Sequence, residues 1–404
     1  MKLLILSSYF TPDLSAGSFR IQALCDEIVK NYPNANVDIL TTKPNRYSTY
    51  SKPALNFEKF GNVNITRFDV RPHSGNLLSQ ILTFLDFSYK VYKNTSDKKY
   101  NIVFASSSRL MTASLGALIS RKVGANLYLD IRDLFLDTIL SVFTFKAKIF
   151  LFPILSLVER FTFSSARKIN LVSRGFEDYV KKKYPNQNLS FYPNGIDDVF
   201  LDLPLFQNNQ KITHPETKDK IKILYAGNLG EGQVIDKILP DISNCLDNKY
   251  EFIIIGDGSR KNCLEQVLIK MGLKNVILLD PMPRDELIQQ YNNADILFLH
   301  LDDNLAFKKV LPSKIFEYAA IGKPILAGVS GYAESFINEF IDNAKVFPPC
   351  NAKSAIEAMN NLVIINQSRE KFIKTFSRSK IMENLAKDIF DESNLNTTNL
   401  KTNA

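Results

Sequence analysis

Short runs of apolar residues alternate with stretches of helical periodicity along the whole chain. In the first half, buried strands are predicted at 3–7, 36–41, 64–68, 102–105, 126–131, 168–172 and 189–192. The pattern restarts in the second half, at 221–226, 251–255, 276–279, 296–299 and 324–327, with a short run at 345–347. Strands that alternate with helices in this way form parallel sheets. The sequence therefore predicts an α/β fold of two Rossmann-like, doubly wound domains.

The segment between the two sets of strands is rich in Pro, Asn, Gln and Lys and poor in apolar residues, as is typical of a linker. We expect a first domain at 1–200, a linker at 201–220 and a second domain at 221–368. Helical periodicity at 369–393 predicts a C-terminal helix that packs back on the first domain. The Asn- and Thr-rich end, 394–404, predicts a flexible tail.

Composition places the chain among folded globular proteins. Of its 404 residues 45% are hydrophobic and 23% are charged, and its four cysteines form no Cys-x-x-Cys motif. The first residues lack the long apolar segment of a signal peptide, and the longest apolar run, 149–158, contains Pro153. Because a spanning helix needs about 20 residues, we expect no transmembrane segment and a cytoplasmic location.

Positive charge is concentrated in the first half of the chain. Residues 1–200 carry 26 Lys and Arg against 16 Asp and Glu, a net +10, whereas the remainder carries 24 against 26. No nucleic-acid-binding motif accompanies this charge, so we expect no nucleic-acid partner. The segment 138–163 mixes six Phe with Lys and Arg, which suits an interfacial helix and equally suits a buried helix pair. An anionic membrane surface is therefore the expected partner, with peripheral attachment to the inner face of the cell membrane.

The most informative chemical pattern lies at 311–326. Pro312 suits the start of a helix, Gly322 suits its left-handed C-cap, and a buried strand follows. The amides near Ser313 and Lys314, the helix dipole and the lysine ammonium together form a site suited to a diphosphate. Glu317 lies one turn further on the same face, where it would accept hydrogen bonds from a ribose. The alternative is a surface pair between the lysine and the glutamate.

Glycine-rich turns follow two strands of the second domain. Gly227 begins a turn in which Asn228 and Gln233 add neutral hydrogen-bond donors, and such glycines let the backbone approach a ligand closely. Gly256 and Asp257 end the next strand in a turn that would touch a base or ribose. Plain structural turns would have the same composition.

The first domain contributes a second set of candidates. Gly17 would let the loop after the first strand approach a substrate, and Arg132 and Asp133 follow a strand whose carboxyl end should face a cleft. A structural ion pair of Arg132 with Asp130 or Asp133 is an equal alternative. Asn194 lies in a Pro-Asn-Gly turn where the first domain ends.

The three histidines, His73, His214 and His300, are scattered along the chain. None accompanies a nucleophile motif or has metal-ligand spacing, so neither a hydrolytic triad nor a zinc mechanism is expected.

Seven segments in order carry a family resemblance: they are Tyr9-Phe-Thr-Pro, Asp130-Ile-Arg-Asp-Leu, Tyr192-Pro-Asn-Gly-Ile-Asp, Tyr225-Ala-Gly-Asn-Leu-Gly, Ile255-Gly-Asp-Gly, Asn293-Ala-Asp-Ile and Pro312-Ser-Lys-Ile-Phe-Glu-Tyr-Ala-Ala-Ile-Gly-Lys-Pro. Taken together, they resemble family 4 of the retaining glycosyltransferases, which have the two-domain GT-B fold. The Pro-Ser-Lys sequence in the last segment resembles the subgroup found in O-antigen and capsule biosynthesis.

By this resemblance Glu317 matches the second Glu of the family's E-x7-E motif, which binds the donor ribose. The chain has Lys309 in place of the first Glu, and Asn228, Gln233 and Arg132 where the family has Arg, Lys and His. The expected catalytic residues are Lys314, Asp133 and Glu317. The expected donor site comprises Gly17, Gly227, Asn228, Gln233, Gly256, Asp257, Lys309, Pro312, Ser313, Lys314, Ile315 and Glu317, and the expected acceptor side comprises Arg132, Asp133 and Asn194.

The resemblance implies transfer of a sugar, with retention, from a nucleotide-diphosphate donor bound in the cleft between the domains. A UDP-sugar is the expected donor, and a glycan or polyprenyl-diphosphate-linked glycan of a bacterial surface polysaccharide is the expected acceptor. No metal or other cofactor is expected, because fixed cations would stabilise the departing diphosphate. The alternatives are a nucleotide-sugar 2-epimerase of the same architecture and an inactive scaffold of a polysaccharide assembly complex.

Overall fold

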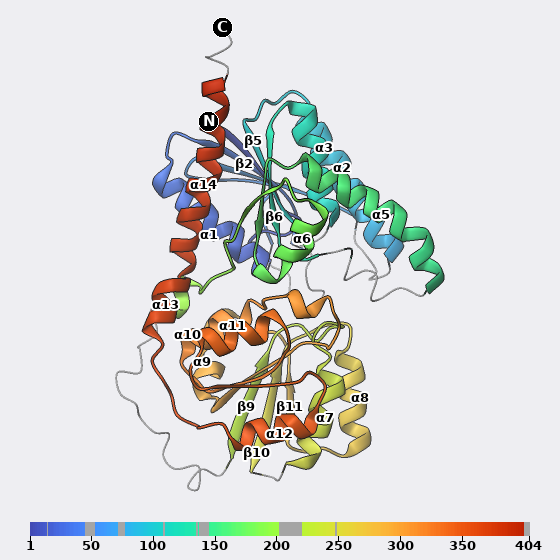
Figure 1. Ribbon diagram of the computed structural model, residues 1–404, viewed down its shortest axis with the longest axis vertical. Helices are drawn as coiled ribbons and strands as arrows, with labels where there is room; N and C mark the ends of the chain where they lie inside the picture. The colour runs from blue at the N-terminus through green and yellow to red at the C-terminus, as the bar shows by residue number, and fades with distance from the viewer. Residues whose placement is uncertain are drawn as a thin grey trace. The chain divides into compact units, whose positions relative to one another are not determined.

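The computed structural model describes residues 1–13, 15–44, 53–71, 77–107, 110–134, 136, 145–201, 220–246 and 249–399. The chain divides into two compact units (Figure 1). The first comprises Met1–Asn194 and Arg378–Ala404, and the second comprises Gly195–Ser377. Residues 195–200, expected in the first domain, thus belong to the second unit. Most of the predicted linker, and the tail from residue 400, lie outside the described residues.

An eight-stranded sheet in the order β3-β4-β2-β1-β5-β6-β7-β8 forms the centre of the first unit. Its strands are β1 (Lys2–Leu6), β2 (Asn36–Thr42), β3 (Phe57–Phe60), β4 (Val63–Phe68), β5 (Ile102–Ser107), β6 (Asn126–Ile131), β7 (Lys168–Leu171) and β8 (Asn188–Ser190). The described helices of this unit are α1 (Ala16–Asn31), α2 (Leu77–Asn94), α3 (Leu110–Val123), α5 (Phe145–Ser165), α6 (Glu177–Lys183) and α14 (Arg378–Asn399).

The sequence pattern missed strand β3. It pairs antiparallel with β4 at the edge of the sheet, and all four of its residues are exposed. An edge strand with neither face buried leaves no alternation of apolar and polar residues, so periodicity could not reveal it.

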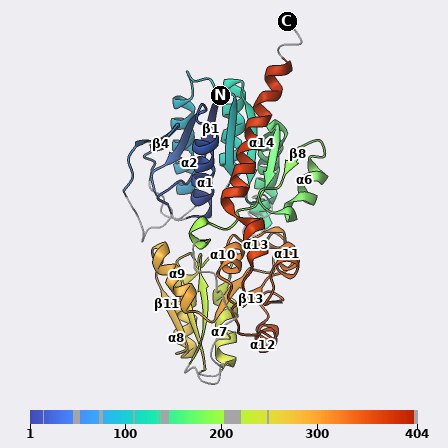
Figure 2. The ribbon, with the colours of Figure 1, turned by 90° about the vertical axis from the view of Figure 1, so that its left-hand side faces the viewer.

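The C-terminal helix α14 lies along α1 in the first unit (Figure 2). Leu385 and Ile389 are fully buried in the core cluster that also contains Ile21 and Leu24 of α1. The helix begins at Arg378 and continues to Asn399, beyond the predicted end at 393, and the short α13 (Glu370–Phe376) precedes it in the second unit. Apolar burial thus ties the C-terminal helix to the first unit.

The second unit contains a six-stranded parallel sheet in the order β11-β10-β9-β12-β13-β14. The predicted α/β fold with two parallel-sheet domains is therefore confirmed. Its strands are β9 (Ile221–Ala226), β10 (Tyr250–Ile255), β11 (Val276–Leu279), β12 (Ile296–His300), β13 (Ile325–Gly328) and β14 (Ala344–Phe347). Its other described helices are α7 (Ile235–Cys245), α8 (Lys261–Met271), α9 (Arg284–Asn293), α10 (Lys314–Ile321), α11 (Tyr332–Phe340) and α12 (Ala352–Asn360).

Within the residues described, no helix combines the length and the apolar character needed to cross a membrane. The predicted 138–163 segment is described only from residue 145, where α5 begins.

A fully buried ion pair corrects one sequence interpretation. Asp130, at the end of β6, pairs with Arg20 of α1, where the sequence had offered Arg132 as the partner. Its two carboxylate oxygens accept from Arg20 Nε at 3.0 Å and Nη2 at 2.8 Å, and also from Ser106 and Asn170. A buried carboxylate is tolerated only with such complete pairing, and the sequence separation of 110 residues hid the partner.

The same arginine holds the segment by which the chain leaves the first unit. Arg20 Nη1 donates to the carbonyl of Pro193 at 2.7 Å, and Nη2 donates to that of Tyr192 at 2.9 Å. Arg378, where the chain returns, donates to the carbonyl of Asn194 at 2.9 Å. The residues before the boundary are therefore fixed to this unit by two buried arginines.

Asp130→Asn should lower the free energy of unfolding by about 3–5 kcal/mol, because it leaves the Arg20 guanidinium buried without a counter-charge. Urea denaturation followed by circular dichroism measures this. The matched control is Lys43→Gln, which removes an exposed ion pair to Asp69 and should cost less than about 1 kcal/mol. An equal, small loss in both variants would contradict the role given to the buried pair.

Candidate functional site

The strand order of the second sheet reverses between β9 and β12. In an open parallel sheet, the loops that leave the carboxyl ends of two such strands part to opposite faces, and ligands bind in the resulting crevice. Here those loops are 227–234, after β9, and 301–313, after β12. Most of the donor-site candidates lie on these two loops or on the helix that follows the second.

The turn after β9 lies tightly against the turn after β10. Gly227 and Gly256 have φ angles of +151° and +156°, which favour glycine, and a Cβ on Gly256 would collide with the carbonyl oxygen of Gly227. The Leu229 amide donates to the carbonyl of Asp257 at 2.9 Å. The Asp257 carboxylate accepts from the amide of Gly258 at 2.8 Å. These glycines therefore bring two turns together at one edge of the sheet.

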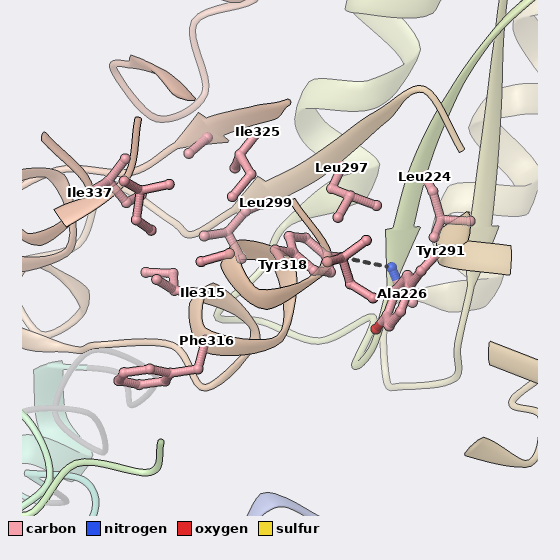
Figure 3. Packing of buried hydrophobic residues seen from close by; sticks show 14 of the residues in the cluster. Leu224, Ala226, Tyr291, Leu297, Leu299, Ile315, Phe316, Tyr318, Ile325 and Ile337 are labelled. Carbon is pink, nitrogen blue, oxygen red and sulfur yellow. Dashed lines mark hydrogen bonds between the residues drawn. The ribbon is translucent and has the colours of Figure 1, made fainter. Parts of the chain in front are cut away.

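Helix α10 is held in place by its inner face. Ile315, Phe316 and Tyr318 are buried in the core of the second unit (Figure 3). The Tyr318 hydroxyl accepts a hydrogen bond from the amide of Ala226, the last residue of β9, at 3.2 Å. The start of α10 is thereby fixed beside the turn that follows β9.

The first turn of α10 presents positive groups. The amides of Ile315 and Phe316 donate to the carbonyls of Pro312 and Ser313. The described part of the chain provides no acceptor for the amides of Ser313 and Lys314. Ile315 thus contributes neither a side chain nor an available amide, whereas the two preceding amides and the helix dipole suit an anion.

The Lys314 ammonium extends over the β9 turn. A Cβ on Gly227 would collide with Nζ of this lysine, and Nζ lies 5.6 Å from the centroid of the Tyr225 ring. Burial lowers the pKa of Lys314, and the negative charge of Glu317 opposes that shift. A desolvated ammonium beside available amides favours a bound anion.

Glu317 lies one turn along α10, partly exposed, between two side chains of α9. Tyr291 donates to its Oε2 at 3.4 Å, and Nη2 of Arg284 is 3.9 Å from its Oε1. The site therefore combines a cation-rich helix start with a carboxylate whose position is set by a second helix.

Gln233 is held by its side chain and its backbone. Its side-chain oxygen accepts from Asn228 Nδ2 at 2.9 Å. His300 Nδ1 lies 2.8 Å from its carbonyl oxygen, and the Cys350 amide donates to the histidine's Nε2 at 2.9 Å. Because Nε2 accepts, Nδ1 carries the proton and donates. Burial lowers the pKa of His300 to about 4, so the ring is neutral at pH 7.

Lys309 ends a short 3₁₀ turn, Phe307–Lys309, that precedes Pro312. The ring of Phe307 occupies the space that a side chain on Gly232 would fill. The β12 loop therefore packs directly on the β9 loop. Lys309 belongs to the β12 loop, two residues after Phe307.

Four candidates lie in the first unit. The Arg132 guanidinium packs against Gly17 so closely that a Cβ there would collide with it. Asp133 is exposed. Asn194 is buried, and its carbonyl is the acceptor for Arg378.

Sequence reasoning did not find Arg284 and Tyr291, and gave His300 no role. Arg284 opens a helix whose charged first turn resembles any exposed helix start, so no local signal indicates its contact with Glu317 on the following helix. Of the other histidines, His73 and His214 lie outside the described residues. Over the described ranges, no three His, Cys, Asp or Glu side chains are grouped to hold a metal ion.

The fold is that of the GT-B glycosyltransferases. Along their whole lengths the chain and HepE from Anabaena, solved with UDP-glucose, align with a TM-score of 0.60 and 15% identity. Sucrose-phosphate synthase from Thermosynechococcus elongatus aligns with a TM-score of 0.66 and 12% identity, over 100% of this chain and 98% of the synthase.

Residues 206–378 match the family model described as "Glycosyl transferases group 1". The chain is 24% identical over 280 residues to "Probable glycosyltransferase WbjE" from Pseudomonas aeruginosa, covering 68% of this chain and 69% of that protein. It is 23% identical over 248 residues to "Putative colanic acid biosynthesis glycosyl transferase WcaI" from Escherichia coli K12, covering 57% of this chain and 59% of that protein. The matched family region contains the β9 turn and helix α10.

The buried neutral histidine should make stability depend on pH. Because burial lowers the pKa of His300 from its ordinary value of 6.5 to about 4, the unfolded chain binds the extra proton between these values, and stability falls as pH decreases through this window. His300→Asn should be less stable at pH 7, and the difference from wild type should narrow by about 3 kcal/mol by pH 4. Urea denaturation at each pH measures it; a constant difference would contradict the assignment.

Proposed function

We propose that the protein is a retaining glycosyltransferase that takes a sugar from a nucleoside-diphosphate donor bound by the second unit. The observation that carries this proposal is the meeting of the Lys314 ammonium, two available amides and the Glu317 carboxylate at the point where strand order reverses. The matched family region and the donor complex of HepE support the same chemistry. UDP is the proposed nucleotide.

The amides of Ser313 and Lys314 and the lysine ammonium are proposed to bind the diphosphate. They stabilise the charge that develops on the leaving group as the bond to the sugar breaks, a contribution of roughly 3 kcal/mol per donor in other enzymes. Lys309 adds a second cation on the adjoining loop. Because these fixed cations neutralise the diphosphate, the transfer is proposed to need no metal ion.

Glu317 is proposed to accept hydrogen bonds from the ribose hydroxyls. Asn228 and Gln233 supply neutral donors where the sugar and diphosphate approach the β9 turn. In the first unit, Arg132 and the exposed Asp133 are proposed as acceptor-side residues, with Asp133 as the group that orients the incoming hydroxyl. The name of WcaI, a putative colanic acid biosynthesis glycosyl transferase, supports an acceptor among bacterial surface polysaccharides.

Lys314→Ala and Glu317→Ala should each weaken the binding of UDP by about 10- to 100-fold, because each removes a hydrogen bond to a charged group. Isothermal titration calorimetry with UDP, and with GDP as a comparison, measures this. The control is Lys270→Ala, an exposed lysine on α8, which should bind like wild type. Wild-type affinity in both site variants would refute the site.

Product analysis distinguishes a glycosyltransferase from a nucleotide-sugar 2-epimerase. A transferase releases free nucleoside diphosphate when an acceptor is present. A 2-epimerase converts the nucleotide sugar without an acceptor, and no free nucleoside diphosphate accumulates. If calorimetry detects no UDP- or GDP-sugar binding, the proposed donor site is wrong and the result favours the alternative of an inactive scaffold.

We also propose that the first unit attaches to an anionic membrane surface through α2, α3 and α5. Ten large apolar side chains on these helices are 45–68% exposed. Helix α3 packs against both of the others (Figure 1). The exposed side chains are Ile81, Leu82, Leu85, Tyr89 and Tyr92 of α2, Leu118 of α3, and Ile149, Phe152, Ile154 and Leu157 of α5.

Charge favours lipid as the occupant of this surface. The three helices carry seven Lys and Arg against two Asp and Glu. One of those acids, Glu159, is buried with Tyr179, Tyr184 and Lys183 around it. Apolar side chains among basic ones are the composition of an interfacial helix, and lysines near anionic lipid contribute about 1 kcal/mol each.

Leu157→Glu should lower the partition coefficient onto phosphatidylglycerol vesicles at low salt by at least about 10-fold, because it replaces a leucine that the proposal inserts into the lipid with an anion. Vesicle sedimentation measures this. Ile269→Glu, an exposed apolar residue of α8 in the second unit, is the control and should sediment like wild type. Added salt should release the wild type. Absence of wild-type sedimentation at low salt would contradict membrane attachment.

A further inference from the structure

Arg284 lies between two carboxylates of the second unit. Its Nη2 is 2.9 Å from Oδ2 of Asp197 and 3.9 Å from Oε1 of Glu317. Its guanidinium carbon lies 5.0 Å from the ring centroid of Phe200. All three ionic side chains are about one-fifth exposed, so bulk water screens them only in part.

We propose that Arg284 is a positioning residue that holds the Glu317 carboxylate in the orientation that recognises a ribose diol. This rests on the proposed function, because it assigns a role within the same nucleotide site. This role does not require Arg284 to contact the ligand. It acts through the carboxylate, together with the Tyr291 hydroxyl.

The distances explain how the carboxylate is positioned and yet remains able to bind. At 3.9 Å Arg284 attracts the Glu317 carboxylate but does not form a close, bidentate ion pair with it. The hydrogen bond from Tyr291 is also long, at 3.4 Å. An ionised carboxylate offers about four lone-pair directions. Two weak contacts therefore restrict its rotamer and leave directions open for two hydroxyl donors.

Asp197 keeps the arginine from closing on Glu317. Its close contact draws the guanidinium toward the segment just after the unit boundary, and the Phe200 ring adds a cation–π contact on the same side. On its other side the guanidinium faces Glu317, which belongs to a different helix, α10. Arg284 thus lies between the segment that enters the second unit and the carboxylate proposed to bind the ribose.

The test compares nucleotides that differ only in the diol. Calorimetry measures the affinity of UDP and of 2′,3′-dideoxy-UDP, and of the corresponding GDP pair, for the full chain. Wild type should prefer the diol by about 10- to 100-fold, as expected for hydrogen bonds to a charged group. Arg284→Gln should reduce this preference by at least about 5-fold, and Arg284→Lys should restore part of it because a cation returns.

The matched control is Lys220→Gln, which removes an ion pair to Glu251 at the opposite, amino-terminal edge of the same sheet. It should keep the wild-type preference. A role for Arg284 in stability alone would weaken both nucleotides equally and leave the ratio unchanged, and that result overturns the inference. Circular dichroism confirms that the variant is folded.

Two results distinguish an error in the positioning role of Arg284 from an error in the nucleotide site. If wild type prefers the diol and Arg284→Gln keeps that preference, only the positioning role falls. If wild type binds neither UDP nor GDP, the nucleotide site itself is wrong and both fall.

Discussion

The reversal of strand order between β9 and β12 is the constraint on which the candidate site depends. Neighbouring strands that send their chains to opposite faces of a sheet leave their carboxyl ends uncovered. The chain fills that position with a glycine turn on one side and the first turn of α10 on the other. The Tyr318 hydroxyl then ties α10 to the last amide of β9. Residues of β9 and α10 are buried in the same core cluster, so the polar groups that follow β9 and those that begin α10 are held close together.

The electrostatics of the site follow from where its charges are anchored. The β9 turn carries the neutral side chains Asn228 and Gln233, which bond to each other, and the neutral His300 fixes the backbone beneath them. Positive charge is supplied instead from the β12 side, by Lys309 and Lys314. Because Lys314 is partly desolvated, its interaction with an anion is stronger than that of a surface lysine. The cations proposed to bind a diphosphate thus come from one side of the crevice.

The α/β fold, the positions of most strands and the helix at 314–321 could be inferred from the sequence, because continuous apolar runs and Pro and Gly boundaries are local signals. The contacts that position the site are not local. Asp130 pairs with Arg20, 110 residues away, and Glu317 contacts Arg284 and Tyr291 of another helix. Strand β3 was missed since an exposed edge strand has no buried face. What the sequence hides is therefore mainly the choice of partner among many charged residues.

Both segments that join the two units are fastened close to the boundary, each to its own unit. In the first unit, the carbonyl of Asn194 accepts from Arg378; in the second, the amide of Ile196 donates to the carbonyl of Phe376 at 2.7 Å. The backbone between these fastenings is short. Asp197, the next residue, is the one that Arg284 holds. On the second unit the connection therefore leads directly to the guanidinium that also faces Glu317.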